Sequence, residues 1–267
     1  MTDEHLREAR TTVERAEQRS EQEKREQTAG SAKREAIKRV ASAPRRGLRR
    51  FLFENGLVLT ATLLFLLAFV GQILAGRANY NEDQREHGQE PVALGEYLRT
   101  GAFVEATAEN LESEFLQMGV FVVLTVFLYQ RGSSESKKLD QPEAVDQRPE
   151  EARYDPDAPW PVRYGGVPLA LYKHSLSLVL FTLFLVSFAV HAAGGAADYS
   201  EEQLAHGGQA VSAVGYLSTS RFWFESFQNW QSEFLSVAVL VLLSIWLREQ
   251  GSPQSKPVAA SASDTGE

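Results

Sequence analysis

The sequence predicts an all-α membrane protein with four transmembrane helices, and three observations lead to this prediction. The 267-residue chain contains four apolar stretches that lack Asp, Glu, Lys and Arg. A segment repeats itself without gaps at an offset of ~119 residues, and each copy holds two of these stretches. Basic residues are concentrated outside the loops that join the two stretches of each copy. We therefore expect a tandem duplication of a two-helix module, with both termini in the cytoplasm.

The four apolar stretches differ in length. The first and third, residues 57–74 and 175–193, approach the roughly 20 residues that a helix needs to cross about 30 Å of hydrocarbon. The second and fourth, residues 115–129 and 234–247, are shorter and must borrow a turn upstream. The expected spans are listed here in chain order: about 56–75, 111–130, 174–193 and 230–249.

The internal repeat aligns residues 54–137 with residues 173–256, and roughly 31 of 84 aligned positions are identical. We therefore place membrane repeat 1 at 51–137 and membrane repeat 2 at 169–256. The identical pairs include chemically distinctive residues: Gly76 and Gly195, Tyr80 and Tyr199, His87 and His206, Tyr97 and Tyr216, Asn110 and Asn229, Glu114 and Glu233.

Three polar segments flank the repeats. Residues 1–50 are highly charged and are expected to be helical or disordered, because they contain too few apolar residues to form a core. Residues 138–168 are acidic and contain Pro, which is typical of a flexible linker, and residues 257–267 are expected to be a disordered tail. The first apolar stretch follows about fifty residues, which indicates a retained signal anchor rather than a cleaved signal peptide.

The distribution of basic residues predicts the orientation. Of 27 Lys and Arg residues, all but Arg77, Arg85, Arg99 and Arg221 lie in the N-terminal segment, the linker region or the tail region. We expect the protein to lie in the inner membrane of a cell. By the positive-inside rule, both termini and the linker then face the cytoplasm. The two inter-helix loops then lie outside, and the repeats share one orientation.

Side chains at the membrane boundary are expected to anchor the protein to lipid. Arg45, Arg46, Arg49 and Arg50 belong to a basic cluster before the first span, and each contributes about 1 kcal/mol of attraction to anionic lipids. Nucleic-acid or partner binding is the alternative interpretation of this cluster. No aromatic residues interleave with it, so no nucleic acid is expected. Trp223 and Trp230 are expected at the lipid–water boundary.

Each outer loop is expected to begin with a short surface helix. Asn81 and Ser200 are candidate N-cap residues, and Gln84 and Gln203 stand at the capping-box position. Gly88 and Gly207 follow where a C-terminal glycine is expected.

Glu114 and Glu233 are candidates for a proton or cation site. They occupy equivalent positions about one turn inside the outer ends of the second and fourth spans, where ionisable groups are costly and often functional. Facing each other, they could share a proton or bind a cation. An acid in the first turn of a helix also complements the helix dipole, so a structural role is the alternative.

Two further pairs are polar. His87 and His206 each follow an acid by four residues, which allows a metal or pH-sensing site or simple stabilisation of a helix end. Gln72 and His191 are equivalent polar residues inside the first and third spans, where interhelical hydrogen bonding or pore lining are the two alternatives.

Several classes of chemistry lack their usual sequence signals. The chain contains no cysteine, which excludes disulfides and thiolate metal sites. It has no nucleotide-binding glycine motif, no H-E-x-x-H pair and no G-x-S-x-G motif. We therefore expect neither an enzyme nor a cofactor.

The second repeat carries a distinctive series of residues, with a run W-Q-S-E-F-L followed by G-S-P-x-S-K. The series comprises Glu201, Gln203, His206, Gly207, Tyr216, Trp223, Trp230, Gln231, Ser232, Glu233, Phe234, Gly251, Ser252, Pro253, Ser255 and Lys256. It resembles a family of uncharacterised bacterial multipass membrane proteins, a domain-of-unknown-function family. The first repeat departs from this series at Val104, Leu111 and Ser134. The resemblance implies a membrane protein and implies no activity.

Two functions are compatible with these observations. The first is a structural or interaction protein of the bacterial inner membrane, with its acidic outer loops as the contact surface. The alternative is a small proton- or cation-conducting channel or transporter that uses Glu114 and Glu233. Because four spans are few for a pathway within one chain, this alternative predicts a homo-oligomer.

Overall fold

The computed structural model describes residues 47–266, which form helices joined by turns and contain no β-strand. Arg45 and Arg46, two of the expected lipid anchors, lie outside the described residues, as does most of the segment 1–50. The chain divides into two compact units, residues 1–72 and 73–267, and the boundary lies within one long helix.

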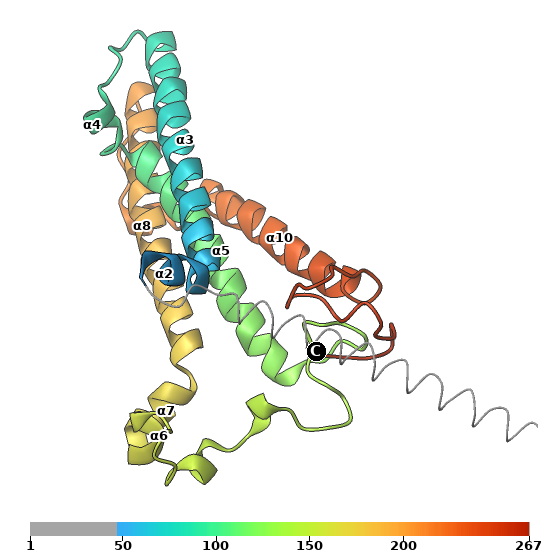
Figure 1. Ribbon diagram of the computed structural model, residues 1–267. Coiled ribbons are helices and arrows are strands. Elements are labelled where there is room, and N and C mark those ends of the chain that lie inside the picture. Colours follow the sequence, from blue (N-terminus) through green and yellow to red (C-terminus); the bar gives the residue numbers. More distant parts are fainter. Residues whose placement is uncertain (1–46, 267) are drawn as a thin grey trace, which may run out of the picture. The chain divides into compact units, whose positions relative to one another are not determined.

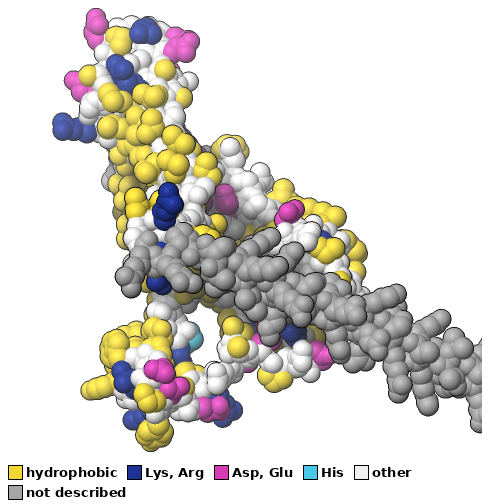
Figure 2. Space-filling model, in the orientation of Figure 1, with side chains coloured by type: hydrophobic (Ala, Val, Ile, Leu, Met, Phe, Trp, Pro, Cys, Tyr) yellow, Lys and Arg dark blue, Asp and Glu magenta, His cyan; other side chains and the backbone are white. Residues whose placement is uncertain are grey.

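The described part of the first unit contains helix α2 (Leu48–Glu54) and the beginning of α3 (Gly56–Glu86). Asn55 separates the two helices, and its side chain donates a hydrogen bond to the carbonyl oxygen of Phe51. Apolar side chains cover α3 on all sides and are largely exposed, with Leu57 reaching 88% exposure. Figure 2 shows hydrophobic side chains along α3 and charged side chains at its far end, a distribution suited to a helix surrounded by lipid.

The second unit contains the end of α3 and the remaining elements, shown in Figure 1. Its long helices are α5 (Gly101–Phe127), α8 (Ser175–Ala205) and α10 (Ser220–Leu243). Its shorter elements are α4 (Leu94–Tyr97), η1 (Ala144–Asp146), η2 (Pro149–Ala152), α6 (Trp160–Tyr164), α7 (Gly166–Lys173) and α9 (Ala213–Tyr216).

The packing of α5 against α8 is the main tertiary contact of the second unit (Figure 1). Small residues allow the two backbones to approach closely. A Cβ atom on Gly101 would lie 2.3 Å from the backbone nitrogen of Asp198, and one on Gly194 would lie 2.7 Å from that of Glu105. Helix pairs in membranes use such small residues because close approach increases van der Waals contact. The contact brings Glu105 against α8.

Helix α10 contacts α5 over a smaller region and diverges from α5 and α8 toward its C-terminal end (Figure 1). Its end is joined to the turn after α5 by a buried hydrogen bond of 2.7 Å between the hydroxyl groups of Ser133 and Ser244. The first part of α10 therefore forms the site described below, while its apolar second part is largely exposed.

The two outer loops share local structure. Thr100 and Thr219 cap α5 and α10, and each side chain accepts a hydrogen bond of 3.3 Å from the backbone N–H three residues later. The side chains of Asn81 and Ser200 accept hydrogen bonds from residues eleven positions later, Val92 and Val211. Polar residues at matching positions thus fix both loops against the ends of α3 and α8.

The prediction of four spanning helices requires correction. Three helices of the described chain are long and apolar enough to cross a membrane: α3, α5 and α8. Helix α10 is not among them. Its first half mixes aromatic residues with charged and amide side chains. The mainly apolar stretch that follows, 234–243, has only ten residues and covers about 15 Å at 1.5 Å per residue. The expected continuation from Ser244 onward is a turn rather than a helix.

The expected separate surface helices at 81–88 and 200–207 are also wrong. Asn81 and Ser200 lie inside α3 and α8, which continue to Glu86 and Ala205 as single helices of 31 residues. The expected glycines do follow the helix ends: Gly88 and Gly207 have φ angles of 71° and 76°. A left-handed residue at this position is usually glycine, because a side chain would be strained there.

The linker and the tail consist largely of turns and irregular segments. The expected flexible linker contains the short helices η1 and η2, and Lys137 pairs with Asp146 across its first part at 2.7 Å. The expectation of a disordered tail does not match the structure. The backbone N–H of Gly266 donates to the carbonyl of Ser133, and the ammonium group of Lys256 donates to three tail carbonyls, those of Ser261, Ala262 and Asp264.

Candidate functional site

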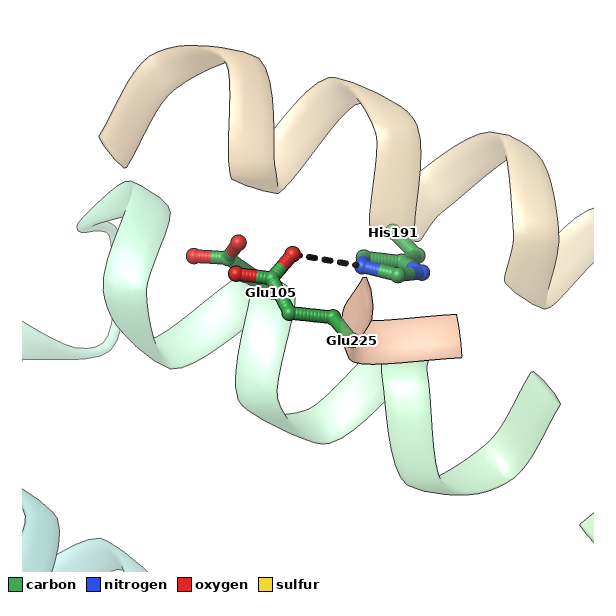
Figure 3. Close-up of side chains that lie close together, drawn as sticks. All are labelled: Glu105, His191 and Glu225. Carbon is green, nitrogen blue, oxygen red and sulfur yellow. Dashed lines mark ion pairs between the residues drawn. The ribbon is translucent and has the colours of Figure 1, made fainter. Parts of the chain in front are cut away.

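A cluster of buried and half-buried ionisable side chains lies where α5, α8 and α10 meet. Glu105 comes from α5, His191 from α8 and Glu225 from α10, as Figure 3 shows. One oxygen or nitrogen atom of each residue lies within 4.8 Å of the corresponding atoms of the other two. Ionisable groups in such a place are costly unless they are paired, so their partners decide what the site can do.

His191 is the centre of the cluster and is completely buried. Its Nδ1 atom lies 2.7 Å from Oε2 of Glu112, which is also completely buried. The other carboxylate oxygen of Glu112 accepts a hydrogen bond of 3.1 Å from the indole N–H of Trp230. The imidazole ring stacks on Phe222, with 4.7 Å between the ring centroids. These contacts fix the orientation of the imidazole.

The second nitrogen of His191 has no hydrogen-bond partner in the described chain. This Nε2 atom lies 3.6 Å from Oε2 of Glu225, which is an ion-pair distance and too long for a good hydrogen bond. Because an ionised Glu112 can only accept, Nδ1 must carry the proton that joins them. In the neutral imidazole, the lone pair of Nε2 therefore faces the carboxylate of Glu225. A positive charge between Nε2 and this carboxylate would be favourable.

Tyr216, at the end of α9, connects the two glutamates. Its hydroxyl oxygen lies 2.8 Å from Oε1 of Glu105 and 2.5 Å from Oε2 of Glu225. A tyrosine hydroxyl group has one proton to donate, so it cannot satisfy two ionised carboxylates at the same time. The site therefore holds a further proton or another cation whenever both contacts are made.

Arg221 closes the cluster on the side of the α8 C-terminus. Its guanidinium group contacts Glu225 at 2.8 Å, Asp198 at 2.8 Å and Glu202 at 2.6 Å, and lies 3.9 Å from Glu105. The planar fork of an arginine suits several carboxylates at once. One guanidinium group therefore serves four acids.

The charges around the cluster do not balance. The carboxylates of Glu105, Asp198 and Glu225 lie beside Arg221, and that of Glu112 lies beside His191, so four carboxylates share one permanent cation. A buried surplus of negative charge is unfavourable unless protons or cations neutralise it.

The groups on α9 and α10 have altered acidities. Burial opposes ionisation of Glu225, but its contacts with His191, Tyr216 and Arg221 outweigh burial and lower its pKa to about 2. Burial and the hydrogen bonds to Glu225 and Glu105 raise the pKa of the Tyr216 hydroxyl group. The surrounding carboxylates raise the pKa of Arg221 in spite of its burial. Glu225 is therefore ionised and Tyr216 keeps its proton at neutral pH.

A pocket of about 620 Å³ lies next to the cluster, between the end of α3 and the end of α8. Asp198 and Glu202 line it and also bind Arg221, so two acids of the pocket wall contact the guanidinium group that pairs with Glu225. His87 and His206 line the same pocket, with their ring centroids 6.3 Å apart. The structure thus brings together the two histidines that the sequence suggested as a pair.

The other predicted site residues lie elsewhere. Glu114 is exposed and Glu233 is half-buried, and they are close enough for the charge of Glu233 to act on Glu114. Neither belongs to the buried cluster. Gln72, the expected counterpart of His191, lies in the first unit. The interhelical hydrogen bond expected as one alternative for His191 is the one to Glu112.

The expected lipid anchors have mixed surroundings. Arg49 and Arg50 are exposed, and Arg50 pairs with Glu54. The indole N–H of Trp223 donates to the carbonyl of Leu217, and Trp230 donates to Glu112. Trp230 therefore takes part in the buried cluster in addition to any contact with lipid.

Sequence reasoning missed Glu105, Glu112, Arg221 and Glu225 as site residues because it compared positions that the two repeats share. A signal was nevertheless present in the sequence. Glu105, Glu109 and Glu112 follow one another at spacings of four and three, which places three acids on one face of a helix.

Most of the chain matches the model of one protein family. A family model described as "Domain of unknown function (DUF6766)" matches residues 48–267. No curated protein and no solved structure matches the chain. Because the match covers more than half of the sequence, the chain belongs to the family of proteins with this domain of unknown function.

Proposed function

We propose that the protein is a multipass protein of the bacterial inner membrane that binds cations in the cluster of Glu105, His191 and Glu225 and conducts or transports them. The observation that carries this proposal is the surplus of carboxylates around one arginine at the junction of α5, α8 and α10. Ionisable residues inside membrane helices commonly mark ion pathways. The role first assigned to Glu114 and Glu233 passes to this cluster, because Glu114 is exposed.

The adjoining pocket supports the proposal, because it offers a route for a cation. Its acidic lining attracts positive charge, and Arg221 lies between the pocket and the buried glutamates. A swing of the Arg221 side chain away from Glu225 would open the cluster to the pocket. The proposal retains the duplicated module, a cytoplasmic N-terminus and assembly as a homo-oligomer, with anionic lipids as partners of the basic flank. With α3, α5 and α8 as the spans, the C-terminus lies on the outer side. It includes neither an enzymatic reaction nor nucleic-acid binding.

Flux measurements on reconstituted proteoliposomes test this function. We expect cation uptake by the unmodified protein and a loss of at least tenfold in the double variant Glu105→Gln, Glu225→Gln. The double variant Glu114→Gln, Glu233→Gln serves as the comparison, because it removes two acids outside the cluster. Equal loss in both variants, or no uptake of protons, alkali cations or divalent cations by the unmodified protein, would reject conduction through the cluster.

A structural or interaction role is the second candidate. The supporting observation is that the outer ends of α3 and α8 are joined to each other: the Tyr80 hydroxyl and the Gln84 amide both donate to Oε1 of Glu201. Exposed acids at this end, Glu82, Asp83 and Glu202, form a surface suited to a basic partner. Purification in mild detergent with and without Glu82→Gln and Asp83→Asn tests this role. A partner that remains bound to the variant would reject the acidic surface as its contact site.

A further inference from the structure

We propose that Glu105, His191 and Glu225 together bind one divalent first-row transition-metal ion. This inference rests on the proposed function and specifies the class of cation. The three residues come from three different helices, so a bound ion would also join α5, α8 and α10. One distance, one unpaired atom and the identity of the ligands support a metal ion at this place.

The distance is that between Nε2 of His191 and Oε2 of Glu225, 3.6 Å. Two ligands of a tetrahedral ion with bonds of about 2.0 Å lie about 3.3 Å apart. A separation of 3.6 Å is therefore long for a hydrogen bond but close to the spacing of two metal ligands. A side-chain shift of a few tenths of an ångström would bring both atoms to bonding distance from one ion.

The unpaired atom is Nε2 of His191, which is buried and has no hydrogen-bond partner in the described chain. The opposite nitrogen, Nδ1, is held by Glu112 at 2.7 Å. Histidine ligands of metals typically donate their other N–H to a carboxylate, which orients the ring and increases its basicity. Glu112 has this position, and Trp230 holds Glu112 in turn. We therefore assign Glu112 as a positioning residue.

The identity of the ligands determines the class of ion. One imidazole nitrogen and two carboxylate oxygens suit Zn²⁺, Mn²⁺, Fe²⁺ or Co²⁺. Mg²⁺ and Ca²⁺ prefer oxygen ligands alone, and Cu⁺ prefers sulfur. The Tyr216 hydroxyl lies between the two carboxylates and is the closest candidate for a fourth ligand. A divalent ion would also neutralise part of the negative charge of the carboxylates in the cluster.

Titration of the chelator-treated, full-length protein in mild detergent tests the site. We expect one Co²⁺ ion per chain, with visible absorption bands typical of low coordination, and competition by Zn²⁺. Glu105→Gln and Glu225→Gln are each expected to lower the affinity at least tenfold. Glu112→Gln is expected to lower the affinity by about 10- to 100-fold while keeping the shape of the Co²⁺ spectrum.

Matched controls separate this site from the histidine pair in the pocket. Glu202→Gln removes another carboxylate bound to Arg221, and the double variant His87→Gln, His206→Gln removes the nearby imidazoles. Both are expected to bind Co²⁺ like the unmodified protein. Loss of binding in the histidine variant alone, or no bound Co²⁺ in the unmodified protein, overturns the inference. The spectrum of the unmodified protein decides the presence of a site even where a variant fails to fold.

The metal inference and the proposed function fail in different ways. Binding of Co²⁺ that depends on Glu105 and Glu225, without flux in proteoliposomes, would leave the metal site intact and reject conduction. Flux that depends on these glutamates, without any bound transition metal, would retain conduction and reject the metal.

Discussion

The hydroxyl oxygen of Tyr216 lies 2.5 Å from Oε2 of Glu225, so the short helix α9 is joined directly to α10. The same oxygen contacts Glu105 on α5, and the ring is completely buried. Helix α5 therefore meets α9 and α10, which lie more than 85 residues later in the sequence, at one hydroxyl group. Removing the hydroxyl group of Tyr216 therefore measures how much its contacts contribute to the stability of the fold.

Tyr216→Phe is expected to destabilise the protein by about 1–3 kcal/mol, because it leaves two buried carboxylates without a shared donor. Tyr97→Phe is the matched control. Tyr97 occupies the equivalent position and is also buried, but its hydroxyl group has no hydrogen bond among the described residues. Thermal unfolding in detergent, followed by circular dichroism, compares the two variants. An equal decrease in stability for both would show that the carboxylate contacts contribute nothing.

Glu112→Gln is expected to cost about 3 kcal/mol, because it removes the charged partner of a buried histidine. Glu112 is completely buried between His191 and Trp230. Glu114→Gln on the same helix changes an exposed carboxylate and is expected to stay within about 0.5 kcal/mol. Unfolding transitions monitored by tryptophan fluorescence test both values. A larger loss of stability in Glu114→Gln than in Glu112→Gln would contradict the assignment of Glu112 as the partner of His191.

Much of the fold could be predicted from local sequence signals. The long apolar stretches identified α3, α5 and α8 as candidate spans, because hydrophobic length is a property of the sequence itself. The fourth span was wrong, since the polar residues Arg221, Glu225 and Asn229 lie in the same helix as the apolar residues 234–243, and the helix ends at Leu243. The amino-acid composition also does not show whether a polar segment forms a separate surface helix or continues a spanning helix. Asn81 and Ser200 looked like caps but lie within continuous helices.

The candidate site could be predicted only in part. His191 was identified because a histidine interrupts an apolar stretch, and the structure shows that it is completely buried. Its partners depend on how α5, α8 and α10 pack, which spacing along one helix does not determine. Glu105 aligns with Phe224 in the repeat and Glu225 aligns with Ala106, so a search for shared positions excluded both. The cluster therefore depends on residues that differ between the two repeats.

Acidification is expected to loosen the segment after α5. The hydrogen bond from Lys137 lowers the pKa of Asp146, with a further contribution from the backbone N–H of Glu143. A lowered folded-state pKa means that this stabilisation is present above the ordinary value of 3.8 and is lost as the pH falls through the lower folded value. Hydrogen-exchange protection of residues 137–146, corrected for intrinsic rates, should therefore fall below about pH 4. Asp146→Asn should remove this dependence, whereas Asp140→Asn should keep it.

Topology can be decided by reporter fusions, because three and four crossings predict different locations for the C-terminus. With three spanning helices and a cytoplasmic N-terminus, fusions after Gln89 and Gly208 are expected to report the outer side and a fusion after Pro142 the cytoplasm. Because α10 is not one of the three, a fusion after Glu267 is also expected to report the outer side. A fusion after Glu267 that reports the cytoplasm would instead show that α10 crosses the membrane.

Substitution at the contact between α5 and α8 should disturb the site from a distance. A Cβ atom on Gly101 would meet backbone atoms of Gly194 and Asp198 at 2.7 Å and 2.3 Å, so the helices must separate. Gly101→Ala is therefore expected to cost about 3 kcal/mol, as overpacking does where neighbours are rigid. Since Glu105 lies one turn further along α5, the same change should lower Co²⁺ affinity at least tenfold. Gly71→Ala in α3 is the control, because nothing lies within 4 Å of its Cβ position, and it should stabilise its helix by about 0.5 kcal/mol. Unchanged stability and metal affinity in Gly101→Ala would show that the close contact does not position Glu105.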